Sequence, residues 1–246
     1  MRIAAISDIH GNLAALDAVL ADIGRRGVDL TVNLGDMLSG PLDPVGTADR
    51  LIALDLPTIR GNHERQLLTL ERVAMGASDA CTAPQLSDCH RAWLASVPVG
   101  MRIAPDILLC HGTPRSDLEY YLDHVGPSGA RAATASEIGE RTGAEAAALI
   151  LCGHTHVPRS HRRPNGQLIV NPGSVGLPAY DDDHPFPHVM ESGTPQARYA
   201  IAERAGDGRW TAEPIAVDYD WDMAARTAEG RGRPDWAIAL RTGRMQ

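Results

Sequence analysis

Apolar runs and amphipathic stretches alternate along the first quarter of the chain. Three runs of apolar and small residues predict buried strands, at residues 2–7, 30–34 and 56–60. Between the first two runs, the apolar residues recur at helical spacing on one face, which consists of Leu13, Leu16, Val19, Leu20 and Ile23. This helix is expected to close at Gly24 and Gly27, and residues 45–54 predict a second helix. The order strand, helix, strand, helix, strand is typical of a parallel sheet.

The remainder of the chain has a less regular pattern and more hairpin signals. Further helices are expected at residues 64–75, 85–94 and 129–142. Further strands are expected at residues 99–103, 107–110, 148–152, 168–170, 197–202 and 210–217. The turn signals Pro105-Asp106 and Gly206-Asp207-Gly208 predict that the first two and the last two of these strands form hairpins. Residues 181–195 are expected to form a mobile loop.

No internal repeat and no clear linker divides the chain. We therefore expect a single domain over residues 1–246, with a core of about residues 1–217. The segment 218–246 is expected to be a C-terminal helical extension or arm. With 43% apolar and 22% charged residues, the composition is that of an ordinary globular protein.

Charge and hydropathy restrict the compartment and the partners. The net charge of -8 argues against a general nucleic-acid binder, which would show a basic face. No stretch approaches the roughly 20 apolar residues of a membrane span. The N-terminal apolar run is short and is interrupted by Asp8, so no signal peptide is expected. The four cysteines form no close pair. We expect a cytoplasmic protein that is a monomer or a small homo-oligomer.

Five predicted strand ends carry side chains that can bind a metal or move a proton. These side chains are Asp8 and His10, Asp36, Asn62 and His63, His111, and His154 and His156. Each fragment alone favours a structural interpretation, because such residues are common in turns. All five together favour a metal site, since functional groups gather beyond the carboxyl ends of parallel strands. Imidazole, carboxylate and amide ligands suit Mn, Fe, Zn, Co or Ni better than Ca.

The five fragments resemble the signature of the calcineurin-like metallophosphoesterases. They match it in order as Asp8-Ile9-His10, Gly35-Asp36, Gly61-Asn62-His63-Glu64, His111 and Gly153-His154-Thr155-His156. The stretches 8–12 and 171–176 are also similar to the compact bacterial and archaeal branch of small phosphodiesterases. The resemblance implies an α/β fold, a four-layer α/β/β/α sandwich of the metallo-dependent phosphatase type, around two divalent transition-metal ions.

The resemblance also implies how the ligands divide between the two ions. The first ion would be held by Asp8, His10 and His156. The second would be held by Asn62, His111 and His154, and the Asp36 carboxylate would bridge the two. Asp8 and Asp36 offset only two of the four positive charges, so the site would stay cationic and suit a phosphate ester. We expect Mn²⁺ to support activity in an assay.

The mechanism expected from this resemblance is in-line attack of a metal-bound hydroxide on phosphorus. His63 is the candidate acid for the leaving group, because it lies beside Asn62 and is not a ligand in the family pattern. The protein Ser/Thr phosphatases follow Gly-Asp with an Asp that orients this His and an Arg that binds phosphate. Here Ser39 stands in that motif, so the orienting carboxylate must come from elsewhere.

Substrate contacts are less well specified by the sequence. Asn12 and Arg60 are candidate substrate-binding residues, and Arg65 and Arg115 are alternatives to Arg60. Specificity is expected in three loops, at residues 79–88, 116–129 and 176–195.

Several functions are compatible with this reading. The first is hydrolysis of a small phosphodiester or phosphomonoester. A nucleotidase, a dinucleoside polyphosphatase or a protein phosphatase would use the same site. A non-catalytic protein-interaction scaffold of the same fold, similar to a retromer subunit, is the alternative outside the enzymes, although His63 and the intact ligand set argue against it.

Overall fold

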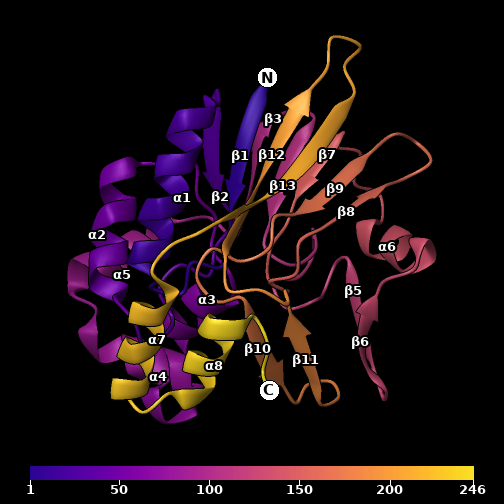
Figure 1. Cartoon of the computed structure of the whole chain (residues 1–246). Helices are drawn as coiled ribbons and strands as arrows, with labels where there is room; N and C mark the ends of the chain where they lie inside the picture. Colours follow the sequence, from indigo (N-terminus) through magenta and orange to yellow (C-terminus); the bar gives the residue numbers. More distant parts are fainter.

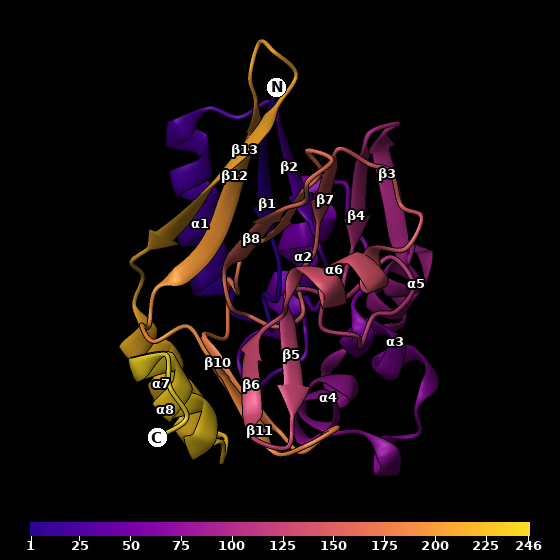
Figure 2. The same cartoon turned by 90° about the vertical axis from the view of Figure 1, so that its right-hand side faces the viewer.

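Two β-sheets lie face to face at the centre of the computed structural model, which describes all residues from 1 to 246 (Figures 1 and 2). The first sheet has the order β13-β12-β1-β2. Its strands are β1 (Arg2–Ile6), β2 (Leu30–Asn33), β12 (Ala197–Arg204) and β13 (Trp210–Val217). β1 and β2 are parallel, whereas β12 is antiparallel to both β1 and β13. This confirms the hairpin predicted for the last two strands.

The second sheet has the order β3-β4-β7-β9-β8. Its strands are β3 (Gly100–Ala104), β4 (Ile107–Cys110), β7 (Leu149–Leu151), β8 (Arg159–Arg162) and β9 (Leu168–Asn171). β4, β7 and β9 are parallel, and β3 forms the predicted hairpin with β4. Buried side chains from both sheets fill the space between them, among them Ile3, Val32, Leu109 and Leu151.

Helices cover the outer face of each sheet. On the first sheet these are α1 (Leu13–Arg26), α2 (Pro44–Leu54) and α5 (Asp88–Ser96), which share an apolar cluster with β1. On the second sheet, α6 (Ala135–Thr142) buries Ile138 against Ile150 and Ile169. The layers therefore run helix, sheet, sheet, helix (Figure 1), and the predicted α/β fold is confirmed.

The helix α1 ends at the second of the two glycines expected to close it. Its N-terminus is capped by Asn12, whose Oδ1 accepts a hydrogen bond from the Ala15 amide at 3.2 Å. The helix does not close at Gly24 but continues to Arg26, because Gly24 adopts ordinary helical backbone and Ile23 stays in the core. It ends at Gly27, which has a φ of 62°.

The predicted strand at residues 56–60 forms only a single parallel bridge, between Asn33 and Thr58. Pro57 has no amide hydrogen, so the segment cannot continue a regular ladder. Hydrogen bonds on either side of it, from Asn33 to the Pro57 carbonyl and from Ile59 to the Asn33 carbonyl, still hold the segment alongside β2. It therefore delivers Gly61 to the same edge of the sheet as a strand would.

The helix predicted at residues 64–75 begins two residues earlier and ends sooner. It is α3 (Asn62–Thr69), followed by the short helices η1 (Arg72–Ala74), α4 (Ala77–Thr82) and η2 (Ala83–Gln85). The early start has a local cause, because the carboxylate of Glu64 accepts the amide of Gly61 at 2.9 Å and so caps the first turn. Asn62 and His63 consequently lie on a helix rather than in a loop.

Two other predicted elements differ in the structure. Residues 129–142 are not one helix: β6 (Gly129–Ala132) pairs with β5 (Asp123–Gly126), and only residues 135–142 are helical. Residues 181–195 are not a simple loop, because β10 (Ala179–Asp182) and β11 (His188–Glu191) form an antiparallel hairpin. In both regions the strands are specified by their partners rather than by their own pattern.

The segment 218–246 forms a pair of helices, α7 (Trp221–Gly230) and α8 (Pro234–Thr242). They share an apolar cluster with Leu42, Leu177 and Ala179 of the main body. In Figures 1 and 2 the pair, coloured yellow, lies beside β10 of the β10–β11 hairpin. No helix of the chain is both long and apolar enough to cross a membrane.

Candidate metal centre

The structure gathers the predicted ligands at one edge of the two sheets. They follow β1, β2, β4 and β7 directly or begin α3, and all but His154 are buried. Six of them form two groups of three. Within each group, the ligand atoms all lie within 4.8 Å of one another. The first group is Asp8, His10 and His156, and the second is Asp36, His111 and His154.

The backbone at these residues is unusual. Six non-glycine residues of the chain have a positive φ, and five of them belong to the two groups: Asp8, His10, Asp36, His154 and His156, with φ between 53° and 73°. A non-glycine residue in this region costs on the order of 1–3 kcal/mol. Hydrogen bonds between the loops hold the conformation, for example from the Asp8 amide to the Gly35 carbonyl at 2.9 Å. Such concentrated strain is typical of a functional site.

In the first group, two imidazole nitrogens and a carboxylate oxygen face one another at short distances. His10 Nδ1 donates a hydrogen bond to the Ser39 carbonyl at 2.8 Å, so in the neutral ring Nε2 carries a free lone pair. That Nε2 lies 3.0 Å from His156 Nε2. Asp8 Oδ1 lies 3.4 Å from the same His156 nitrogen and, although buried, has no hydrogen-bond partner. This donor set fits a cation placed among the three side chains.

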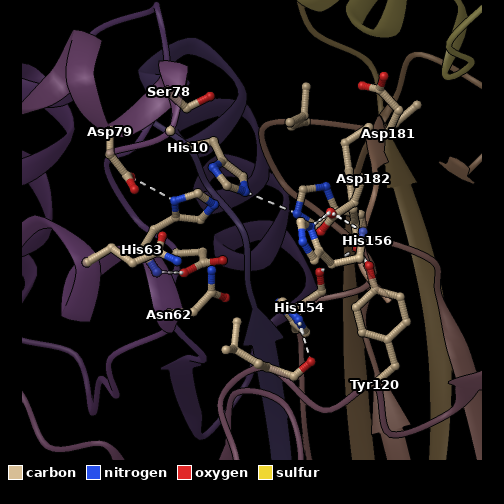
Figure 3. Close-up of a pocket in the computed structure, with 18 of the residues that line it drawn as sticks. His10, Asn62, His63, Ser78, Asp79, Tyr120, His154, His156, Asp181 and Asp182 are labelled. Atoms are coloured by element: carbon tan, nitrogen blue, oxygen red, sulfur yellow. Dashed lines mark hydrogen bonds and ion pairs between the residues drawn. The ribbon is translucent and has the colours of Figure 1, made fainter. Parts of the chain in front are cut away.

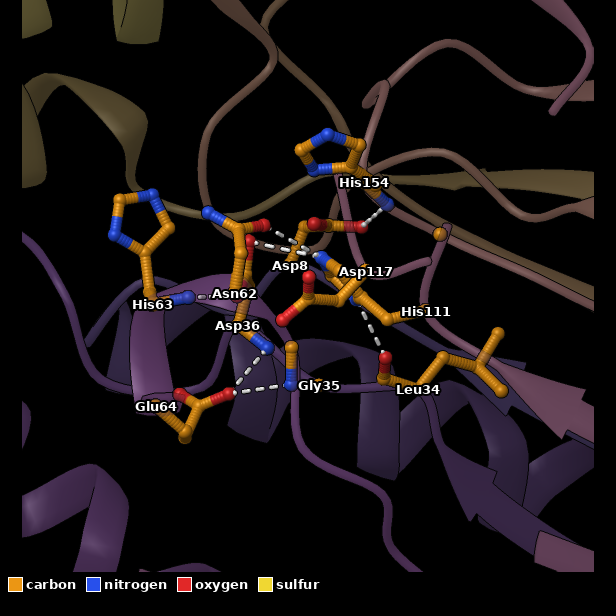
Figure 4. A network of polar contacts seen from close by, with 12 residues as sticks. Asp8, Leu34, Gly35, Asp36, Asn62, His63, Glu64, His111, Asp117 and His154 are labelled. Atoms are coloured by element: carbon orange, nitrogen blue, oxygen red, sulfur yellow. Dashed lines mark hydrogen bonds and ion pairs between the residues drawn. The ribbon is translucent and has the colours of Figure 1, made fainter. Parts of the chain in front are cut away.

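The second group has the same design. His111 Nδ1 donates to the Leu34 carbonyl at 2.7 Å, and its Nε2 faces Asp36 Oδ2 at 3.0 Å and Asn62 Oδ1 at 3.2 Å (Figure 4). His154 Nε2 donates to the Leu118 carbonyl at 3.1 Å, which leaves its Nδ1 free. Metal-binding histidines usually donate their second nitrogen in this way, which fixes the ring and its tautomer. These residues therefore also fit a divalent ion.

Burial and the neighbouring charges shift the pKa values of the centre. Burial lowers the pKa of His10 to about 3 and that of His154 to about 4, with further lowering by neighbouring histidines. Burial opposes the charge on Asp8 and Asp36, but His156 lowers the pKa of Asp8 and His111 lowers that of Asp36. Burial opposes protonation of His111, but Asp36 raises its pKa to about 10, so a bound metal would have to displace that proton. Neutral imidazoles and ionised carboxylates are the forms that bind metals.

Glu64 and Gly61 hold the loop that carries Asp36. Glu64 is fully buried, and its carboxylate accepts the amides of Asp36 at 2.8 Å, Met37 at 2.8 Å and Gly61 at 2.9 Å. A Cβ at Gly61 would lie 2.1 Å from Asp36 Oδ1. Only glycine therefore allows α3 to start so close to this carboxylate.

The carboxylate that orients His63 comes from α4. Asp79 Oδ1 lies 2.7 Å from His63 Nδ1 (Figure 3). The same oxygen accepts a hydrogen bond from the hydroxyl of Ser39 at 2.6 Å. Burial opposes protonation of His63, but Asp36 and Asp79 raise its pKa to about 9. No sequence motif indicates this role, because Asp79 lies forty positions from Ser39, in one of the three loops expected to govern specificity.

A cavity of about 880 Å³ opens over the centre. His63 and Asp79 line it together with the predicted ligands His10, Asp36, Asn62, His154 and His156. Its other walls include Tyr120, Asp181, Asp182 and, from α8, Trp236, so residues of all three expected specificity loops and of the C-terminal helices meet here (Figure 3). A cavity of this size suits a small organic molecule, for which pockets of roughly 300–1,000 Å³ are usual.

The two predicted substrate contacts do not line this cavity. Asn12 donates to the Gly176 carbonyl at 3.0 Å and to the Tyr219 hydroxyl at 3.2 Å, and its oxygen caps α1. Its polar atoms are therefore committed to the fold. Arg60 lies outside the cavity as well, and its backbone amide donates to the Pro98 carbonyl, which precedes β3, at 2.7 Å.

The alternatives to Arg60 do not reach the cavity either. Arg65 pairs with Asp117 at 2.6 Å, and Arg115 pairs with Glu119 at 2.8 Å. The arginines that line the cavity are Arg141 and Arg233, neither of which belongs to a motif recognised in the sequence.

Comparison with known proteins shows what this chain is similar to. The model of the calcineurin-like phosphoesterase superfamily domain matches residues 1–190. An uncharacterized protein of Methanocaldococcus jannaschii, MJ0912, is 26% identical over 262 residues, which cover 95% of this chain and 94% of that protein.

Two solved structures have a similar fold. The crystal structure of a metallophosphoesterase from Sphaerobacter thermophilus has a TM-score of 0.77 and 27% identity and covers 99% of both chains. The crystal structure of a putative diadenosine tetraphosphatase has a TM-score of 0.51 and 19% identity, covering 87% of this chain and 93% of that one. The latter likeness concerns the fold alone.

Proposed function

The chain belongs to the calcineurin-like phosphoesterase superfamily, and on this premise we propose that it hydrolyses a small phosphodiester or phosphomonoester at a centre of two divalent metal ions. One observation carries the proposal: two groups of metal-binding side chains and a His–Asp pair line or underlie a single cavity. Membership of the family supports hydrolysis of a phosphoric ester. The presence of two ligand groups rather than one is our reason for proposing two metal ions.

Seven side chains would hold the two ions. Asp8, His10 and His156 would bind the first, because their free donor atoms converge and Asp8 Oδ1 has no other partner. The second would be bound by Asp36, Asn62, His111 and His154. Mn²⁺ is our choice of metal for assays, since imidazole and carboxylate ligands accept it readily.

When bound, the ions would supply hydroxide at neutral pH, by lowering the pKa of water towards ~7, and would offset charge on the phosphoryl oxygens. The chain would provide the proton for the leaving oxygen in an in-line displacement. Asp79 accepts from His63 Nδ1, so the imidazolium of His63 can present its Nε2 proton to the cavity. General acid help of this kind contributes roughly 10²–10⁴-fold to the rate.

The size of the cavity favours a small molecule over a protein as substrate. About 880 Å³ leaves room for the organic groups of a diester beside the phosphate. A nucleotidase and a dinucleoside polyphosphatase fit the same volume, so both belong in the substrate screen. The non-catalytic scaffold of the same fold is the outcome to be excluded.

The test is an assay with bis-p-nitrophenyl phosphate and p-nitrophenyl phosphate in the presence of Mn²⁺, with the bound metal measured by elemental analysis. We expect turnover of at least one compound. His63→Ala should retain its metal and lose about 10²-fold or more in kcat on substrates with poor leaving groups. Loss of metal in this variant would make His63 a ligand. Absence of all turnover from the metal-loaded wild type would overturn the proposal in favour of the scaffold.

A further inference from the structure

Helix α8 reaches the catalytic cavity from outside the segment that matches the family. The family model ends at residue 190, whereas α8 comprises Pro234–Thr242. Two of its residues and the residue that precedes it line the cavity: Trp236, Ala239 and Arg233. Helix α8 supplies none of the predicted metal ligands, but it forms part of the cavity wall.

Trp236 packs against a predicted metal ligand. Its ring is 5.9 Å from the ring of His10 in an edge-on arrangement, and the side chain is 4% exposed. It also lies over Gly40, where a Cβ would be 2.4 Å from Trp236 Cη2. Gly40 follows Ser39, whose carbonyl accepts from His10 Nδ1. Trp236 therefore contacts both the imidazole and the segment that orients it.

Arg233 connects α8 to the helix that carries Asp79. Its guanidinium is held by Asp235 at 2.6 Å, and its Nη1 donates to the hydroxyl of Ser78 at 3.1 Å. The Arg233 side chain is 19% exposed, and its Cζ lies 5.5 Å from the Trp236 ring centroid. Ser78 directly precedes Asp79, so this hydrogen bond acts one residue from the partner of His63.

Helix α4 needs such an anchor. It has six residues, and a helix this short is unstable without tertiary contacts. At its far end Thr82 accepts the amide of Gly40 at 3.0 Å. The bond from Arg233 to Ser78 holds the near end, which is the end that presents Asp79.

The α7–α8 pair is itself fixed to the main body. Arg231 donates to the carbonyls of Pro41 and Leu42. Beyond α8, the Gly243 carbonyl accepts the amide of Gly193 at 2.9 Å. A helix anchored at both ends can position the residues that it contacts.

We propose that α8 is a functional part of the catalytic centre, in which Arg233 positions the Asp79–His63 pair and Trp236 positions the His10 ring. Both are positioning residues, because neither is required to touch the reacting atoms. The inference rests on the proposed phosphoesterase activity and extends it to the C-terminal helices.

The first test compares Arg233→Ala and Arg233→Lys with Arg241→Ala. Arg241 is on the same helix, pairs with Glu229 and Asp222, and does not line the cavity. Arg233→Ala should lower kcat by about tenfold or more on a poor leaving group, as part of the general acid contribution. It should have a smaller effect on p-nitrophenyl esters and little effect on KM. Arg233→Lys should recover part of the loss, and Arg241→Ala should match the wild type.

The second test needs no turnover. Trp236 is the tryptophan that lines the cavity, so bound Mn²⁺ should quench its fluorescence. Trp236→Phe should remove most of this quenching, whereas Trp93→Phe, on α5, should retain it. Trp236→Ala should weaken Mn²⁺ binding by about tenfold, as expected when a ligand loses its support.

The outcomes separate this inference from the proposed function. Unchanged leaving-group dependence in Arg233→Ala, together with wild-type Mn²⁺ affinity in Trp236→Ala, would overturn the role of α8 and leave the activity intact. A wild type that binds Mn²⁺ but hydrolyses no phosphate ester would overturn the proposed function, while the fluorescence test would still report on Trp236. Melting temperatures of all variants identify any that fail to fold.

Discussion

At the scale of single residues, the Leu38–Gly40 segment supports two different functions. The Ser39 carbonyl accepts from the predicted ligand His10, and the Ser39 hydroxyl donates to Asp79, the partner of His63. Ser39, which stands where an orienting carboxylate was expected, is therefore hydrogen-bonded to the carboxylate of Asp79. Ser39 and the distant Asp79 together place a carboxylate within hydrogen-bond distance of His63.

This arrangement predicts the effect of Asp79→Asn. The amide cannot stabilise the imidazolium of His63 as a carboxylate does, so protonation of the leaving group should become less effective. We expect kcat on alkyl phosphate esters to fall by about tenfold or more, within the range of general acid catalysis. The bound metal should be unchanged, because Asp79 is not among the ligands.

The matched control is Asp88→Asn, an exposed aspartate in the first turn of α5. It should hydrolyse every ester at the wild-type rate. A variant of Asp79 that loses metal, or one whose rate does not depend on the leaving group, would contradict the positioning role. Steady-state kinetics across a series of leaving groups, with elemental analysis, distinguishes these results.

At the scale of elements, the predicted ligands could be found because they are local. Each follows a strand or starts a helix within a few residues, and the strand order brings those ends to one edge. The orienting carboxylate could not be found in this way. Asp79 meets Ser39 and His63 only through the packing of α4, a six-residue helix with no distinctive pattern.

The same reasoning explains the elements that were mispredicted. Residues 129–132 include alanine and arginine, which favour a helix, but they pair with β5 in the structure. The β10–β11 hairpin likewise depends on partners across the turn. Local propensity is a weak guide where pairing decides the outcome. The sequence motifs therefore locate the predicted metal ligands, whereas the other residues that line the cavity are brought there by long-range packing.

Gly61 packs so closely against Asp36 at the start of α3 that adding a methyl group there should be destabilising. In Gly61→Ala the new Cβ would meet Asp36 Oδ1 at 2.1 Å and disturb the carboxylate braced by Glu64. We expect about 1–3 kcal/mol of lost stability, typical of overpacking, and weaker Mn²⁺ binding. Urea unfolding and metal titration measure the two effects.

Gly24→Ala is the control for this substitution. Gly24 lies within α1, and a Cβ there would meet nothing within 4 Å. The same chemical change should therefore raise the free energy of unfolding by about 0.4–1 kcal/mol, because alanine restricts the unfolded chain. Equal effects at the two glycines would show that the close approach at Gly61 does not matter.

At the scale of the whole molecule, the centre joins segments that are far apart in the sequence. Its two groups take residues from position 8 to position 156, and the β-sheets to which they belong pack against each other through one core. Five of these residues have strained backbone, and Asp8 Oδ1, which faces the first group, is buried without a partner. The metal-free fold therefore contains a concentrated cost that bound ions can offset.

This cost predicts that metal binding stabilises the entire domain. An ion that binds only the folded state at 100 times its Kd adds about 2.7 kcal/mol, so Mn²⁺ should raise the melting temperature and a chelator should reverse the rise. The gain should decline as the pH falls, because protons compete for the imidazoles and carboxylates. Replacing one ligand from each group, as in Asp8→Asn with His111→Ala, should remove the response. If calorimetry finds the same melting temperature without Mn²⁺ and with saturating Mn²⁺, the side chains of these loops do not bind the metal.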